Sequence, residues 1–118
     1  YQMAVISNKP EAASREILAA LDLAHHFRVI AGGDSFEEMK PSGLPILRVI
    51  ENVGAAKEHT WMIGDSSYDI EAGKNAGVRT AAVTYGFQAA DILKALEPDH
   101  TVSAFSQLRE IFLSDQEN

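Results

Sequence analysis

The sequence predicts one three-layer α/β/α domain built around a parallel β-sheet, and three observations support this fold class. Short apolar runs alternate with helical patterns along the chain, as in proteins whose parallel strands are joined by helices. The chain has 118 residues, which suits one domain with its own hydrophobic core. Its hydrophobic share of 46% and its charged share of 23% are those of an ordinary globular protein.

The first part of the chain predicts a strand, a helix and a second strand. Residues 3–6 are apolar and end at the polar residues 7–9, as expected for a strand that leads into a turn. Pro10 suits the first position of a helix. The helix is marked by apolar residues at helical spacing, namely Ala13, Ile17, Leu21 and Ala24. Residues 27–31 form the second strand, which two glycines and an aspartate end.

The remaining elements repeat this alternation. Gly54 and Gly77 each follow a helical pattern and suit the position just past a helix end. The expected elements are a loop at 36–43, a helix with apolar residues from Ile46 to Val53, a strand at 60–63, a helix at 67–76, a strand at 79–84, a loop at 85–87, a short helix at 89–96, a strand at 101–102 and a last helix around 108–112 before a tail at 114–118.

Composition excludes several classes of function. The net charge of −7 argues against non-specific binding to nucleic acid and against a polybasic membrane-binding surface. The chain has no cysteine, which excludes disulfides, thiolate chemistry and cysteine-bound zinc. No apolar stretch approaches the length of a membrane span and no signal peptide is visible, so we expect a cytoplasmic location.

Two aspartates give the most informative pattern in the chain. An apolar run ends at Gly64, Asp65 follows at once, and Asp69 comes four residues later, where a helical pattern begins. Carboxylates at the carboxyl end of a parallel strand lie where open α/β sheets bind ligands, and their oxygens suit Mg²⁺. Both residues also have a simpler interpretation, because aspartate is common at the start of a helix.

Polar residues follow two other predicted strands as well. Ser7 comes directly after the first strand, and Lys40 lies in the loop after the second. Because parallel strands end at the same edge of a sheet, we expect Ser7, Lys40 and Asp65 to converge into a site for a phosphoryl group and its metal. Simpler interpretations stay open: Ser7 caps a helix, Lys40 is a solvated loop lysine, and Asn8 and Lys9 are turn residues.

These motifs resemble those of the haloacid dehalogenase superfamily, and in particular its phosphoglycolate phosphatase-like branch. Residues 4–10 are similar to the second motif of that family, a strand that ends in serine or threonine. Lys40-Pro41 is similar to the third motif, and residues 64–69, Gly-Asp-Ser-Ser-Tyr-Asp, are similar to the fourth. Gly43 departs from the pattern, because these phosphatases often have proline there.

The resemblance implies a Rossmann-like core and a Mg²⁺-dependent hydrolase that acts on small phosphorylated metabolites through an aspartyl-phosphate. By this resemblance Ser7 binds the transferring phosphoryl group and Lys40 offsets the charge of nucleophile and phosphate. The implied catalytic residues are Lys40 and Ser7, the implied substrate-binding residues are Ser7, Asn8, Lys9 and Lys40, and the implied metal ligands are Asp65 and Asp69.

The first motif of the family, Asp-x-Asp-Gly with its nucleophilic aspartate, does not occur in this sequence, and neither does a helical cap. The resemblance therefore identifies residues 1–118 as the C-terminal portion of a core domain that is inactive by itself. In the family the nucleophile strand lies between the strands of the second and fourth motifs. We expect that another segment or a second copy of the chain fills this place, or that the two strands pair directly.

Two other classes of protein compete with this interpretation. One is a non-catalytic α/β module that binds phosphate or a metal. The other is a response-regulator receiver domain, which has a similar length and build. Receivers carry an acidic pair on the first strand and a lysine on the last, whereas here Lys40 precedes Asp65, so the receiver interpretation is disfavoured.

Overall fold

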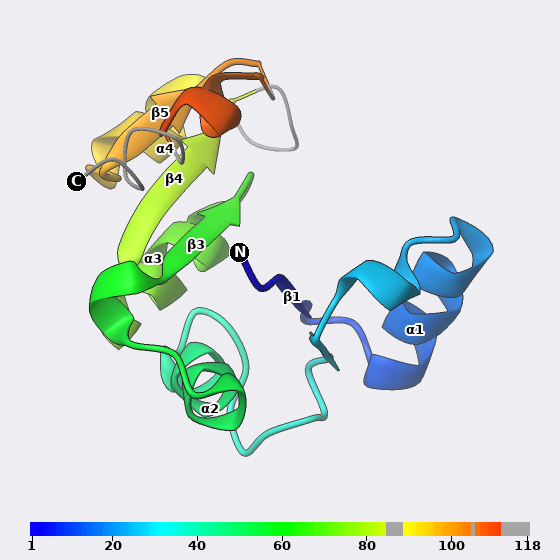
Figure 1. Ribbon diagram of the computed structural model, residues 1–118. Helices are drawn as coiled ribbons and strands as arrows, with labels where there is room; N and C mark the ends of the chain where they lie inside the picture. The colour runs from blue at the N-terminus through cyan, green and yellow to red at the C-terminus, as the bar shows by residue number, and fades with distance from the viewer. Residues whose placement is uncertain (85–88, 105, 112–118) are drawn as a thin grey trace.

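The structure is a computed structural model, and it describes residues 1–84, 89–104 and 106–111. Strands and helices alternate along these residues, as Figure 1 shows. The elements are β1 (Ala4–Ile6), α1 (Glu11–Ala20), β2 (Val29–Ala31), α2 (Leu44–Val53), β3 (Trp61–Gly64), α3 (Ser67–Ala76), β4 (Arg79–Val83), α4 (Ala90–Ala95) and β5 (His100–Val102), with short 3-10 helices η1 (Ala24–His26) and η2 (Lys57–His59). Residues 106–111 are also helical.

The strands form two separate parallel sheets. β1 pairs with β2, and β3, β4 and β5 form a second sheet in that order. The predicted α/β class with parallel strands is confirmed, and among the described residues no strand lies between β1 and β3. β1 and β3 do not pair with each other, so the alternative of direct pairing is not what the chain adopts. Each of these two strands therefore has one edge that no described strand occupies.

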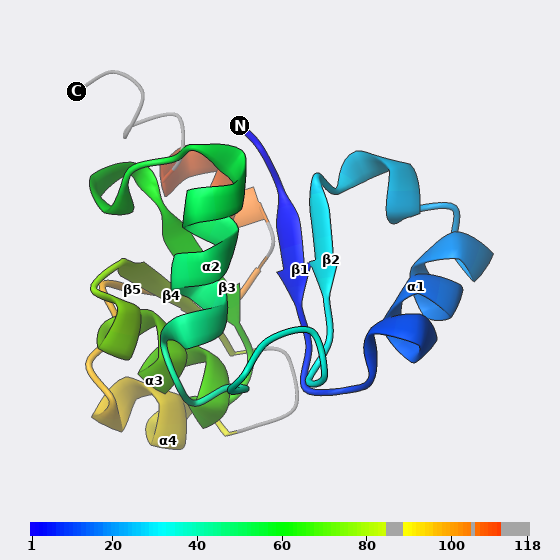
Figure 2. The ribbon, with the colours of Figure 1, turned by 90° about the horizontal axis from the view of Figure 1, so that it is seen from below.

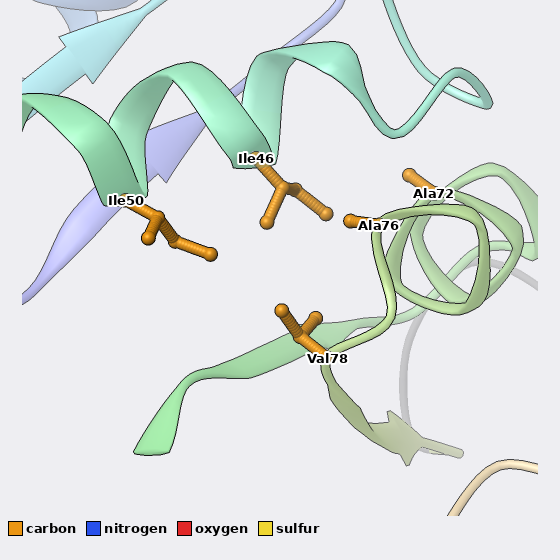
Figure 3. Close-up of a cluster of buried hydrophobic side chains, with 5 residues drawn as sticks. All are labelled: Ile46, Ile50, Ala72, Ala76 and Val78. Carbon is orange, nitrogen blue, oxygen red and sulfur yellow. The ribbon is translucent and has the colours of Figure 1, made fainter. Parts of the chain in front are cut away.

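Helix α2 joins the two sheets through a hydrophobic cluster (Figure 3). The cluster consists of buried side chains from α2, from α3 and from the residue before β4, namely Ile46, Ile50, Ala72, Ala76 and Val78. Ile6 of β1 and Met62 of β3 pack against it from the two sheets. Because burial of one isoleucine side chain stabilises a fold by about 1.5–3 kcal/mol, this cluster is a main source of cohesion between the sheets. In Figure 2, α2 and α1 flank the β1–β2 pair on opposite sides.

The second sheet is covered on both faces. Ala82 of β4 packs with Ile70 of α3 and Leu93 of α4 on one face. Its neighbours along the strand, Ala81 and Val83, pack on the other face in a cluster that includes Leu108 of the helical residues 106–111, with Ile111 packed against it. Successive residues of a strand point to opposite faces, so β4 lies between two helical layers. The predicted three-layer arrangement is therefore present around this strand.

Helix ends are the best-predicted boundaries. α2 and α3 end at Gly54 and Gly77, with φ angles of 70° and 77°. These lie in the left-handed region, which glycine adopts without steric cost. Pro10 stands one position before α1, not at its first residue, with φ −55° and ψ 146°. The predicted bounds of α3, 67–76, match the structure.

Helix α1 departs furthest from prediction. It ends at Ala20, so the predicted apolar series runs past the helix and into η1. The second strand consequently begins at Val29 and not at residue 27. Within the series, Ile17 is 45% exposed and Leu21 62% exposed. Periodicity located an apolar face on α1, but most of that face has no cover among the described residues.

The other strands and the short helix differ from prediction by one residue at an end. In the described part of the chain, no helix has the length and apolar character needed to cross a bilayer. The expected loop at 85–87, the end of the last helix at 112 and the tail at 114–118 lie outside the described residues.

Candidate active site

Asp69 lies in the first turn of α3, where it is part of a capping box with Ser66. The Ser66 hydroxyl accepts a hydrogen bond from the Asp69 backbone N–H at 3.4 Å. In return Asp69 Oδ2 accepts from the Ser66 backbone N–H at 3.2 Å and from its hydroxyl at 3.0 Å. These bonds use backbone N–H groups that a helix start leaves without intrahelical partners. Asp69 thus occupies the first turn of α3, where its negative charge suits the helix dipole, and its side chain is buried.

The second oxygen of Asp69 is bound by Lys40. Lys40 Nζ lies 2.5 Å from Asp69 Oδ1, and the two side chains are only 11% and 8% exposed. Charged groups are buried at a cost unless they are paired and hydrogen-bonded. Here the ammonium and the carboxylate meet this condition for each other. Lys40 is therefore not a solvated loop lysine, and its charge is fixed beside the end of β3.

Gly64, the last residue of β3, makes room for this carboxylate. A Cβ atom on Gly64 would lie 2.2 Å from Asp69 Oδ2 and 2.3 Å from Asp69 Cβ. These distances are too short for any side chain, so Asp69 can press against the strand end only because the residue there is glycine. The glycine of the Gly64-Asp65 run thus marks the end of a strand and also a place of close packing against Asp69.

Asp65 follows Gly64 directly, at the carboxyl end of β3, and is partly buried. Ser7 occupies the equivalent place after β1, and its backbone N–H extends the ladder by donating to the carbonyl of Ala31 at 3.0 Å. The Ser7 hydroxyl accepts a hydrogen bond from the backbone N–H of Lys9 at 3.0 Å. Lys9 itself is exposed.

Lys40 connects the ends of β1 and β3. Its backbone is bound by the side chain of Asn8, the second residue after β1, at 2.9 and 3.1 Å. Its ammonium is bound by Asp69, which abuts the last residue of β3. The structure therefore brings Asn8, Lys40 and Asp69 into one chain of contacts between the two sheets. Ser7 precedes Asn8 in the sequence, and Asp65 follows Gly64, which Asp69 contacts.

Three contributors to this arrangement were not predicted from the sequence. They are Ser66 as the capping partner, Asn75 as a donor to the carbonyl of Pro41 at 2.9 Å, and Gly43, whose Cβ would lie 2.6 Å from the backbone nitrogen of Ala76. A capping-box pattern, with a serine three residues before an acidic residue, is a signal for Ser66. Asn75 and Gly43 act through contacts between distant parts of the chain, for which the sequence has no local signal.

The loop that leads to Lys40 is anchored on the start of α1. Asp34 accepts a hydrogen bond from the backbone N–H of Glu11 at 2.7 Å. The Glu11 carboxylate in turn accepts from the hydroxyl of Ser35 at 2.7 Å and from Arg15 Nε at 3.0 Å. These bonds favour the ionised form, with that from Ser35 the largest effect, and hold the pKa of Glu11 below its ordinary value of 4.5.

The donor set was tested against Mg²⁺, which prefers carboxylate oxygens together with water and phosphate oxygens. Asp65 supplies an oxygen donor of the right kind at the strand end. Both oxygens of Asp69 already have partners, and no group of three or more acidic, histidine or cysteine side chains gathers within the described residues. The residues therefore fit Mg²⁺ in chemistry but not in number, and Asp65 and Asp69 as metal ligands stay a prediction.

Comparison with known proteins identifies the family to which the chain belongs. The family model described as haloacid dehalogenase-like hydrolase matches residues 1–83. A phosphoglycolate phosphatase of Aquifex aeolicus (strain VF5) is 43% identical over 108 residues, which are 92% of this chain and 49% of that protein. Pyrophosphatase PpaX of Halalkalibacterium halodurans is 34% identical over 94% of this chain and 52% of its own length.

Solved structures agree with the sequence comparison. The crystal structure of a predicted phosphoglycolate phosphatase from Haemophilus somnus 129pt matches 95% of this chain and 50% of its own with a TM-score of 0.89 at 30% identity. A putative β-phosphoglucomutase from Thermotoga maritima matches 86% of this chain and 47% of its own with a TM-score of 0.78 at 26% identity. The chain spans about half the length of the curated relatives it matches. The family resemblance seen in the sequence is confirmed, and the chain belongs to the haloacid dehalogenase-like hydrolase family.

Proposed function

We propose that these 118 residues serve in a Mg²⁺-dependent phosphatase that hydrolyses small phosphomonoesters of the phosphoglycolate kind. The observation that carries this proposal is the buried Lys40–Asp69 pair between the ends of β1 and β3. It fixes a positive charge beside Asp69, which abuts the last residue of β3, and phosphoryl transfer depends mainly on such positioning and charge stabilisation. The names of the relatives, phosphoglycolate phosphatases and a pyrophosphatase, support a small phosphorylated substrate, and the phosphoglycolate phosphatases support a phosphomonoester.

Each side chain has a proposed role. The Ser7 hydroxyl and the backbone N–H groups after β1 bind the phosphoryl oxygens, with Asn8 and Lys9 as neighbours of the phosphate. Lys40 offsets negative charge on the phosphoryl group. Asp65 ligates Mg²⁺, which when bound supplies charge neutralisation at the phosphoryl oxygens. Asp69 supports the metal site through its place beside Gly64 and keeps Lys40 oriented.

The nucleophile is proposed to lie outside this chain, on a strand between β1 and β3. This proposal is supported by the pairing of β1 and β3, each of which has one edge without a partner strand among the described residues. Ser7 is a poor substitute for this nucleophile. Its hydroxyl accepts a hydrogen bond from the backbone N–H of Lys9, and this group cannot act as a general base. A small phosphorylated metabolite and a segment that completes the sheet are thus the proposed partners, with a cytoplasmic location and no role for nucleic acid or membrane.

The alternative is a module that binds phosphate or a metal without catalysis. The positioned Lys40 ammonium suits phosphate binding without catalysis by the chain taken by itself. The two proposals differ in what happens when the sequence is extended upstream, since only the first expects turnover to follow.

The test compares the 118-residue chain with the protein encoded when the upstream coding sequence is included. Release of inorganic phosphate from phosphoglycolate and from a generic aryl phosphate is measured with and without Mg²⁺. We expect turnover by the longer protein only, and loss of most of it in Asp65→Ala. Metal-dependent turnover by the purified 118-residue chain would show that the catalytic residue has been misplaced.

A further inference from the structure

Two asparagine side chains bind the backbone of the segment Lys40–Pro41. Asn8 Nδ2 donates to the carbonyl of Lys40 at 2.9 Å, and Asn8 Oδ1 accepts from the N–H of the same residue at 3.1 Å. The side-chain amide thus pairs with both polar groups of one residue, as a neighbouring backbone would. Two bonds to one residue fix its position and orientation together, which a single bond cannot do.

The other side of the segment is held by α3. Asn75 Nδ2 donates to the carbonyl of Pro41 at 2.9 Å. Two residues further on, Gly43 approaches the last turn of this helix so closely that a Cβ would lie 2.6 Å from the backbone nitrogen of Ala76. The segment is therefore fastened at Lys40 to the end of β1 and at Pro41 to α3, which packs on β3.

This double attachment has a consequence for the Lys40 side chain. Lysine has four rotatable bonds, and holding it in one conformation costs about 1.5–2 kcal/mol of side-chain entropy. Because the backbone of Lys40 is fixed by hydrogen bonds, the position of its Cα atom is fixed as well. The side chain then extends from this position to place the ammonium beside Asp69. The same segment joins two sheets whose strands do not pair, because Asn8 follows β1 of one sheet and Asn75 lies in α3, which packs on the other.

We propose that Asn8 and Asn75 are positioning residues that clamp the Lys40–Pro41 backbone, and that this clamp sets both the reach of the Lys40 ammonium and the alignment of the β1 end against the β3 end. The catalytic meaning of the clamp rests on the proposed function. The clamp itself does not, and it is tested on the 118-residue chain without substrate.

The first measurement is amide hydrogen exchange at Lys40. Asn8→Ala removes the acceptor of the Lys40 N–H, and we expect exchange there to accelerate at least tenfold, the change that about 1.4 kcal/mol of lost protection produces. Asn8→Asp keeps an oxygen at this place, so Lys40 should stay protected. Asn52→Ala, on the exposed side of α2, is the matched control. Unaltered exchange in β4 shows that each variant stays folded.

The second measurement is the reactivity of lysine side chains with an acylating reagent, read by mass spectrometry. We expect Lys40 to react severalfold faster in Asn8→Ala and in Asn75→Ala, while the exposed lysines 57, 74 and 94 react as before. Leu93→Ala controls for general destabilisation, because Leu93 is buried in a different cluster from that of α2, with Ile70 and Ala82. In that variant Lys40 should react faster only in step with exchange in β4.

Unchanged exchange and unchanged reactivity of Lys40 in Asn8→Ala would overturn the clamp. So would an acceleration no larger than that of Leu93→Ala at equal stability. A longer protein without phosphatase activity would refute the proposed function alone, since neither measurement uses turnover. If instead Asn8 acts as a direct phosphate ligand, titration with inorganic phosphate moves its side-chain NH₂ signals while Lys40 keeps its protection in Asn8→Ala, and the clamp is wrong.

Discussion

At the scale of single residues, the site depends on one buried ion pair whose members come from different halves of the chain. Asp69 was expected as a supporting metal ligand and Lys40 as a charge for phosphate. Their direct contact was not expected, because 29 positions separate them and nothing local indicates it. Gly64 was interpreted as the end of a strand, and its second role, making space for the Asp69 carboxylate, is visible only in three dimensions.

The first residue-scale prediction concerns the ion pair. Lys40→Met should lower the free energy of unfolding by about 3 kcal/mol, because it leaves a buried carboxylate without its cation. Asp69→Asn should also destabilise, but the double variant should lose less than the sum of the two. Chemical denaturation of the four proteins measures this coupling. Lys74→Met, on the exposed side of α3, is the control and should change stability by less than about 0.5 kcal/mol.

The second residue-scale prediction concerns the metal. Mg²⁺ should bind the chain weakly at Asp65, because no group of three or more acidic, histidine or cysteine side chains gathers in the described part of the chain. In an NMR titration the amides of residues 64–69 should shift first, and these shifts should vanish in Asp65→Asn. Asp91→Asn, exposed on α4, should leave them as they are. Equal shifts with and without the Asp65 carboxylate would place the ion elsewhere.

At the scale of elements, local chemistry determined what the sequence predicted well. Gly54 and Gly77 mark helix ends by their own left-handed conformations, so these ends were found within a residue. The start of β2 was placed two residues too early, because Phe27 is the C-cap of η1 and the strand begins at Val29. Ile17 and Leu21 repeat at helical spacing, but spacing reports which face of α1 is apolar and not whether another element covers it.

The element-scale prediction concerns the start of α1. Bonds from Ser35 and Arg15 lower the pKa of Glu11 in the folded chain, so its ionised form stabilises the fold. Wild-type should therefore exceed Glu11→Gln in the free energy of unfolding by a constant amount above the ordinary pKa of 4.5. The difference should fall as the pH drops through the lowered pKa of the folded state. Glu16→Gln, exposed on the same helix, should show no such decline.

At the scale of the whole molecule, the α/β class followed from the alternation of patterns, but the division into two sheets did not. Strand patterns report that a segment suits a sheet and do not report which strand lies beside it. β1 and β3 each satisfy the strand pattern, and each pairs on one side with another strand. The periodicity of a strand does not reveal which other strand it pairs with, so it cannot show that β1 and β3 belong to different sheets.

The molecule-scale prediction is uneven protection from hydrogen exchange. β4 lies inside its sheet and is covered on both faces, whereas β1 and β2 form a two-stranded sheet that α2 connects to the rest. Amides of β4 should therefore exchange at least ten times more slowly than those of β1 and β2. In the longer protein of the proposed function, a strand between the sheets should bring the rates together. Equal rates in the 118-residue chain would mean that it unfolds as one unit.

The bridging position of α2 also has a consequence for biosynthesis. A ribosome releases β1, α1 and β2 first, then α2, and only later α3 and the residue before β4. Ile46 and Ile50 therefore emerge before Ala72, Ala76 and Val78, the side chains against which they become buried. During this interval the apolar face of α2 is exposed to water or to a chaperone, since translation adds only about 5–20 residues per second. Helix α2, which connects the two sheets in the folded chain, therefore emerges during synthesis before the residues of α3 and the residue before β4 that bury its apolar face.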